Sequence, residues 1–140
     1  AGRLLPAPAP GTGRPGAAGS CIVVALTDGP LDAAACGRLA RRAGLGLART
    51  GSTARHGSGE IFLALATGLR APRGQEAPGA PVTGCALDGY FAAMVEATEE
   101  AVLNSLLQAE TVSGRDGHVS VQLPPGELRR ILAGREQGGR

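Results

Sequence analysis

Hydrophobic and polar positions separate a loose N-terminal segment from a patterned remainder of the chain. Residues 1–19 have no apolar period and are rich in Pro, Gly and Ala, which predicts a linker or mobile tail. Residues 21–27 (CIVVALT) and 60–67 (EIFLALAT) are continuous apolar runs of strand length. Such runs are typical of strands buried on both faces, so we expect the folded part to begin at Ser20 and to contain two of them.

The segment between the two predicted strands has a helical period. Its apolar positions recur along one face at Leu31, Ala35, Leu39 and Ala43. Asp28 is the candidate N-cap, and Pro30 falls in the first turn. We expect this helix to end near Gly44 or Gly46, because glycine commonly follows the last helical residue.

The strongest periodic signal covers residues 85–110, after a long Pro/Gly-rich loop over residues 68–84. Apolar residues and one threonine recur there at three- and four-residue steps: Leu87, Phe91, Met94, Val95, Thr98, Val102, Leu106 and Ala109. This predicts one long helix. Residues 117–124 alternate like a strand, and residues 124–134 start with prolines and predict a short terminal helix. The order predicts a layered α/β fold with helices packed on a sheet.

Composition and charge narrow the function classes. The 140 residues carry 14 basic and 12 acidic side chains, a net charge of +2, and every basic residue is arginine. This balance is too even to indicate nucleic-acid binding, and two Phe, one Tyr and no Trp leave few rings for stacking on bases. No apolar run approaches the roughly 18 residues of a membrane span. We therefore expect neither a nucleic-acid nor a membrane partner.

Cysteine usage bears on compartment and metals. Cys21, Cys36 and Cys85 form no CxxC pair and are odd in number, so neither a disulfide framework nor a zinc site is indicated. We expect a reducing, cytoplasmic environment, with no metal. Because Ala1 is not an initiator methionine, we expect a processed chain or a fragment, and an upstream targeting signal stays open.

The glycine-rich segment GSTARHGSGE, residues 51–60, is a candidate phosphate loop by composition. It matches neither GxxxxGK[ST] nor GxGxxG, and it leads into a predicted strand rather than a helix, so phosphate binding is not indicated. His56 and His118, the two histidines, are far apart in the sequence, and no serine lies in a GxSxG elbow. A Ser-His-Asp hydrolase is not indicated, and both histidines are expected to be ordinary loop residues.

Ser20, at the boundary between the loose segment and the first predicted strand, has two interpretations. It is either the last residue of a linker or a nucleophile that becomes an N-terminus when the Gly19–Ser20 bond is cut. A free α-amine titrates at about 7.7–8.0 in model peptides, so part of it is neutral at physiological pH and can take the hydroxyl proton. Gly19 gives the backbone freedom that a scissile bond needs. The residues alone leave both interpretations open.

Several segments, in order, resemble one known family. GSCIVVALT, LARTG, GSGEIFLA and ATEEAVLN, together with the run to about Leu132, are similar to the region around the self-cleavage site of the DmpA family of aminopeptidases. This family includes L-aminopeptidase/D-esterase-amidases and β-peptidyl aminopeptidases. The resemblance implies an αββα four-layer sandwich of the DmpA and ornithine acetyltransferase type, of which this chain is the C-terminal part.

The same resemblance implies a division of the chain and a set of site residues. Residues 1–19 would be the end of an α-subunit segment and residues 20–140 the catalytic β-subunit portion. Cleavage between Gly19 and Ser20 would make Ser20 the nucleophile, and Ser58 and Glu60 would complete the catalytic group without a cofactor. Lying two residues apart, Ser58 and Glu60 would share one side of an extended chain.

The implied function is a self-processing serine aminopeptidase that releases N-terminal residues from small peptides, amides or esters through an acyl-enzyme. Its implied partners are the remaining α-subunit segment and further αβ units in a homo-oligomer. Two alternatives remain. One is acyl transfer of the ornithine acetyltransferase type, which uses a threonine at the cut. The other is a non-catalytic, truncated structural subunit, an interpretation favoured by the short segment before Ser20.

Overall fold

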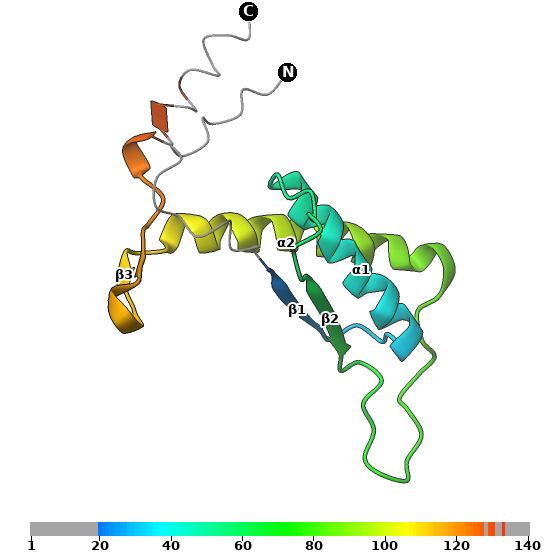
Figure 1. The fold of residues 1–140 in the computed structure, drawn as a ribbon. Helices are drawn as coiled ribbons and strands as arrows, with labels where there is room; N and C mark the ends of the chain where they lie inside the picture. Colours follow the sequence, from blue (N-terminus) through cyan, green and yellow to red (C-terminus); the bar gives the residue numbers. More distant parts are fainter. Residues whose placement is uncertain (1–19, 128, 131–132, 134–140) are drawn as a thin grey trace, which may run out of the picture.

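The computed structural model describes residues 20–127, 129–130 and 133, and the predicted linker over residues 1–19 lies outside them (Figure 1). The elements are β1 (Ile22–Thr27), α1 (Ala33–Arg49), β2 (Ile61–Ala66), the 3₁₀ turn η1 (Gly84–Leu87), α2 (Asp88–Gln108), β3 (Val112–Ser113), the 3₁₀ turn η2 (Arg115–Gly117) and β4 (Val119–Ser120). Residues 125–127 and 129–130 are helical. The predicted order of elements is confirmed, with β3 as an addition.

Strands β1 and β2 form a parallel two-stranded sheet, with α1 as the connection between them. The register pairs Ile22 with Ile61 and Thr27 with Ala66. Parallel neighbours need such a crossover, because the chain must return to the end where it started. In Figure 1, α1 lies on one face of this sheet and α2 packs along α1. The chain is therefore a layered α/β unit, as the pattern predicts.

The sheet is covered on one face only. Val23 and Ala25 of β1, with Phe62 and Ala64 of β2, pack into the core formed with α1 and α2. The alternate side chains lie on the other face and are between 46% and 75% exposed: Ile22, Val24, Leu26, Ile61, Leu63 and Leu65. The expectation of strands buried on both faces is therefore wrong for the described residues. Parallel sheets are normally covered on both sides, so the outward face lacks its cover here.

Helix α1 starts later than the sequence pattern predicts. Its N-cap is Asp32, whose side-chain oxygen accepts a hydrogen bond from the Ala35 amide at 2.7 Å. Asp28, the predicted cap, and Pro30 both precede the helix, and Pro30 lies in a turn that is closed by a hydrogen bond from the Leu31 amide to the Gly29 carbonyl at 2.9 Å. The predicted start of the helix is wrong because Asp32, and not Asp28, is the aspartate whose side chain accepts a hydrogen bond from an amide of the first turn.

Helix α1 also continues past both glycines to Arg49. A Cβ at Gly46 would lie 2.5 Å from the Val95 carbonyl oxygen and 2.7 Å from the Thr98 Cβ, both on α2. Gly46 is therefore a contact point between the two helices rather than a terminator. The intrinsic cost of glycine in a helix, about 1 kcal/mol, is offset by the close packing that its missing side chain allows.

The substitution Gly46→Ala is expected to lower the free energy of unfolding by about 1–3 kcal/mol, because the added methyl meets backbone atoms that cannot move aside. Gly37, also in α1, has open space where a Cβ would lie, with no atom within 4 Å, so Gly37→Ala is expected to raise it by about 0.5–1 kcal/mol. Urea denaturation followed by circular dichroism measures both. Equal effects of the two substitutions would contradict the helix contact at Gly46.

The predicted long helix is present but is buried along only part of its length. Leu87, at the end of η1, and Phe91, Met94, Val95 and Thr98 of α2 are buried, as their spacing predicts. The later members of the stripe differ: Val102 is half-buried, and Leu106 and Ala109 are exposed. The apolar period therefore continues beyond the buried part of the helix, because α1, which covers the first half of α2, does not extend over the second half (Figure 1).

The last predicted strand is much shorter than its alternating pattern. Of residues 117–124, β4 contains only Val119 and Ser120, which pair antiparallel with Ser113 and Val112 of β3. Both strands are exposed. The sequence pattern missed β3, because two residues are too few for a detectable alternation.

Candidate active site

Ser20 and the residues before β2 meet at one end of the sheet. Parallel pairing sets Ile22 opposite Ile61, and the Ile61 amide donates to the Cys21 carbonyl at 2.9 Å, which continues the register toward Ser20. The Gly59 amide donates a hydrogen bond to the Ser20 hydroxyl oxygen at 3.3 Å. Two residues that are 39 apart in the sequence are thus brought into contact. Ser20 is exposed, so its hydroxyl is open to a ligand.

Ser58 and Glu60 form the second part of the site. The Ser58 hydroxyl donates a short hydrogen bond to the Glu60 Oε1 atom, and both residues are half-buried. A turn holds Ser58, because its amide donates to the Arg55 carbonyl at 2.8 Å. The expectation that these two side chains lie on one side of the chain is confirmed. Gly59 between them is the residue whose amide reaches Ser20.

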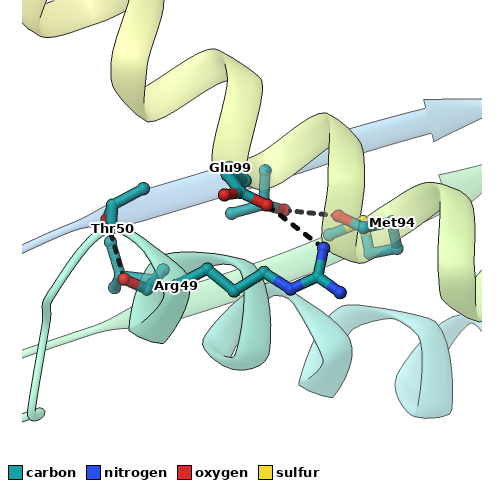
Figure 2. Close-up of polar contacts among 6 residues, drawn as sticks. Arg49, Thr50, Met94 and Glu99 are labelled. Carbon is teal, nitrogen blue, oxygen red and sulfur yellow. Dashed lines mark hydrogen bonds and ion pairs between the residues drawn. The ribbon is translucent and has the colours of Figure 1, made fainter. Parts of the chain in front are cut away.

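The loop over residues 50–60 is anchored where it leaves α1. The Thr50 hydroxyl donates to the Leu47 carbonyl at 2.7 Å, and the Arg49 guanidinium forms an ion pair with Glu99 of α2 at 3.1 Å. Figure 2 shows both contacts, with Arg49 reaching across from α1 to α2. The ion pair is largely exposed, so its contribution to stability is small. It nevertheless connects the base of this loop to the long helix.

The backbone of the same loop adopts an unusual conformation at Ala54. Its φ is +45°, in the left-handed region that residues with a Cβ seldom adopt. The Ala54 amide donates to the Ser52 hydroxyl at 3.3 Å, which helps to hold the turn. Strain of this kind is most often retained near functional sites, where the surrounding structure holds it.

Chemically, the arrangement places one exposed hydroxyl next to one amide donor and one hydroxyl–carboxylate pair. A hydroxyl needs a base to become a good nucleophile. Gly19, on the other side of the predicted cut, lies outside the described residues. Gly59 is the contributor that the sequence pattern missed. Gly59 precedes β2, and β2 pairs in parallel with β1, the strand that follows Ser20. The contact between Gly59 and Ser20 could therefore be found only once the register of these two strands is known.

The histidines and cysteines are spread along the chain, with Cys21 directly after Ser20 and His56 in the same loop as Ser58. His56 and His118 are both exposed loop residues. Cys21, Cys36 and Cys85 are free thiols, the first two half-buried and the third exposed. In the part of the chain that the structure describes, no three His, Cys, Asp or Glu residues gather as metal ligands would. Within the same described ranges, no helix is both long and apolar enough to cross a membrane.

Comparison with protein families and curated proteins gives consistent matches. The model of peptidase family S58 matches residues 2–120. The β-peptidyl aminopeptidase BapA of Sphingosinicella microcystinivorans is 38% identical over 117 residues, which are 81% of this chain. BapA of Sphingosinicella xenopeptidilytica is 37% identical over 131 residues, or 90% of this chain. The chain spans about 30% of the length of these curated relatives, with 30% and 32% of each covered.

Solved structures agree with these matches. The L-aminopeptidase D-Ala-esterase/amidase from Ochrobactrum anthropi, described as a variant of the Ntn hydrolase fold, aligns with a TM-score of 0.70 and 35% identity. That alignment covers 84% of this chain and 33% of the enzyme. A Burkholderia sp. β-aminopeptidase aligns with a TM-score of 0.62 and 38% identity, over 82% of this chain and 35% of that protein. At these identities the neighbours indicate more than a shared fold.

Proposed function

Because the chain belongs to peptidase family S58, the DmpA family, we propose that it is the catalytic portion of a serine aminopeptidase. The proposed enzyme releases the N-terminal residue of small peptides, amides or esters. The observation that carries this proposal is the convergence at one end of the sheet, where the Gly59 amide reaches the Ser20 hydroxyl and the neighbouring Ser58 and Glu60 are hydrogen-bonded to each other. The proposed acylation of the Ser20 hydroxyl by the substrate requires neither a metal nor a cofactor.

We propose that activity begins with cleavage of the Gly19–Ser20 bond. The cut would give Ser20 a free α-amine next to its own hydroxyl, so that one residue supplies both the nucleophile and the general base. The position supports this proposal: Ser20 is exposed, and the parallel pairing of β1 with β2 fixes the chain two residues later. No histidine is needed as the base.

In the proposed reaction, the Ser20 hydroxyl oxygen attacks the substrate carbonyl carbon while the neutral α-amine takes the hydroxyl proton. The bond to the leaving group then breaks, the leaving amine or alcohol takes a proton from the ammonium, and Ser20 is left acylated. In the second half, the α-amine takes a proton from a water molecule whose oxygen attacks the acyl carbon. The bond from that carbon to the Ser20 oxygen then breaks, the Ser20 oxygen takes the proton from the ammonium, and the carboxylic acid product is released. The Gly59 amide, which donates to the Ser20 hydroxyl oxygen, would lie close to the substrate carbonyl oxygen, where negative charge develops during the attack. Ser58, oriented by Glu60, would relay or stabilise the moving proton.

The four-layer αββα sandwich is part of the same proposal. The outward face of the sheet, made of Ile22, Val24 and Leu26 with Ile61, Leu63 and Leu65, is apolar and exposed. A second sheet lying on this face would bury it, in the manner of sheet-on-sheet packing. We propose that the remaining part of the protein supplies that sheet, and that such αβ units form a homo-oligomer. The cytoplasmic location stays a prediction.

An activity assay distinguishes the proposed function from its two alternatives. Amino-acid p-nitroanilides are expected to release p-nitroaniline, whereas acyl transfer between ornithine derivatives is expected at background. Mass spectrometry of the protein expressed together with the proposed α-subunit segment is expected to give a product that starts at Ser20. An uncut protein that still hydrolyses anilides would overturn the role of the α-amine. A cut protein active only in acyl transfer would favour the transferase, and a protein inactive in both assays a structural subunit.

A further inference from the structure

The two packed helices, α1 and α2, carry charges of opposite sign. Helix α1 has no acidic side chain, and its basic side chains are Arg38, Arg41, Arg42 and Arg49. Helix α2 has no basic side chain, and its acidic side chains are Asp88, Glu96, Glu99 and Glu100. The pair of helices is therefore positive along one member and negative along the other.

Most of these charges lie on the outward side of the helix pair. The four arginines and Leu45 recur at three- and four-residue steps, which places them along one side of α1. The buried residues of α1 form a different set: Ala35, Leu39, Ala40, Ala43, Gly46 and Leu47. On α2, the same spacing joins Glu96, Glu99, Glu100 and Leu103, none of which is buried. These two rows of residues are called the charged helix face below.

The two rows adjoin, but few of their charges pair within the chain. Arg49 reaches Glu99 at 3.1 Å, as Figure 2 shows, and this is the one ion pair between α1 and α2 in the described structure. Arg38 and Arg42 instead lie over the Phe91 ring of α2, at 5.1 and 4.0 Å from its centroid. Two guanidinium groups over one ring repel each other, so a carboxylate from outside the chain would be stabilised beside them.

A second copy of the same chain presents charges that match this face. The two helices run in the same direction, because residues in contact advance together along them. Arg42 lies over Phe91, and later in both helices Arg49 pairs with Glu99. Rotating a second copy by 180° about an axis that runs along the helices and between them sets each α1 opposite the α2 of the other copy. Positive and negative rows then meet twice.

Resting on the homo-oligomer of the proposed function, we propose that the charged helix face is the contact between two copies in a symmetric dimer. The unpaired arginines of one copy face the exposed Glu96 and Glu100 of the other. Leu45, which is 58% exposed, and Leu103, which is 44% exposed, add apolar area between the charges. The second sheet proposed above lies on the opposite side of β1 and β2, so it leaves this face free.

The test reverses one charge in each row. Arg41 and Glu100 are exposed, so Arg41→Glu and Glu100→Arg should both leave the fold intact. Sedimentation equilibrium of the processed protein, expressed together with the proposed α-subunit segment, measures the dissociation constant of self-association. Each variant is expected to raise it about tenfold or more, because the symmetry of the contact repeats the reversed charge at two places.

A double variant and a control make the test specific. The double variant with both reversals should associate more tightly than either single variant, because opposite charges face each other again. Arg73→Glu is the matched control, since Arg73 is an exposed arginine in the loop after β2 and lies outside both helices. It makes the same charge change and should leave the dissociation constant unchanged. Higher salt should weaken association of the unmodified protein, because ions screen surface charges.

The outcomes separate this proposal from the proposed function. Unchanged association in both single variants, with an oligomeric unmodified protein, overturns the charged helix face and leaves the homo-oligomer intact. A double variant no tighter than the single ones also overturns it, since the losses would then not come from facing charges. A monomeric unmodified protein overturns the face together with the homo-oligomer, whereas the anilide assay decides the aminopeptidase activity independently.

Discussion

The substitution Ser20→Ala is expected to abolish both the cleavage before residue 20 and the release of p-nitroaniline, lowering kcat by about 10⁴-fold or more. Removal of a nucleophilic serine costs about 10⁶ in kcat in a well-studied serine protease, and what remains comes from binding and electrostatic stabilisation. The loss has a simple physical reason: in the proposed reaction the Ser20 hydroxyl is the group that forms the acyl-enzyme. Steady-state kinetics and mass spectrometry on the same preparation measure the two effects.

A matched control for this experiment is Ser113→Ala, because Ser113 is an exposed serine on β3, which pairs with β4 in a sheet separate from β1 and β2. It should retain both cleavage and activity. The thermal unfolding midpoint of Ser20→Ala should stay close to that of the unmodified protein, since Ser20 is exposed. An alanine variant that releases p-nitroaniline at the unmodified rate would show that another group is the nucleophile.

The second large effect is expected at the hydroxyl–carboxylate pair. Ser58→Ala removes the donor of the hydrogen bond to Glu60, and Glu60→Gln removes the negative charge that orients it. Each is expected to lower kcat by about 10²-fold or more, the usual contribution of a group that moves or stabilises a proton. Because the two side chains act through one hydrogen bond, the double variant should lose little more than either single one.

Glu76→Gln is the control for the charge at Glu60, because Glu76 is an exposed glutamate in the loop after β2. Kinetics of the single and double variants, with a denaturation curve for each, separate loss of chemistry from loss of folding. Activity near that of the unmodified enzyme in both single variants would remove Ser58 and Glu60 from the site. Fully additive losses would mean that they act independently.

Local pattern was sufficient for much of the fold. The apolar runs predicted β1 and β2 within one or two residues, and the four-residue steps from Leu31 to Ala43 predicted the buried face of α1. Such elements can be predicted because their periods, two and 3.6, follow from backbone geometry alone. The family resemblance implied Ser58 and Glu60, and the same geometry predicted only that these two side chains share one side of the chain, since they lie two residues apart.

Boundaries and burial could not be predicted in the same way. Asp28 and Asp32 are both acceptable caps by residue type, and Asp32 is the one whose side chain reaches an amide of the helix. Gly46 is a residue type that often ends a helix, but in this structure it is the point where α1 packs closely against α2. Leu106 belongs to the apolar period of α2 and yet is exposed. In each case a neighbouring element decides the outcome, and one sequence does not say which elements are neighbours.

By itself, the sequence determined the elements and their order, because these depend on residue types at short spacing. The residues made Ser20 a candidate nucleophile, and the resemblance to the DmpA family implied Ser58 and Glu60 as the other site residues. Only the tertiary structure decided that Gly59 contacts Ser20, that Gly46 joins the two helices, and that the arginines of α1 adjoin the glutamates of α2. These features join segments tens of residues apart. They follow from helix packing and from the register of two parallel strands. In a strand, a shift of one residue would turn every side chain to the opposite face of the sheet.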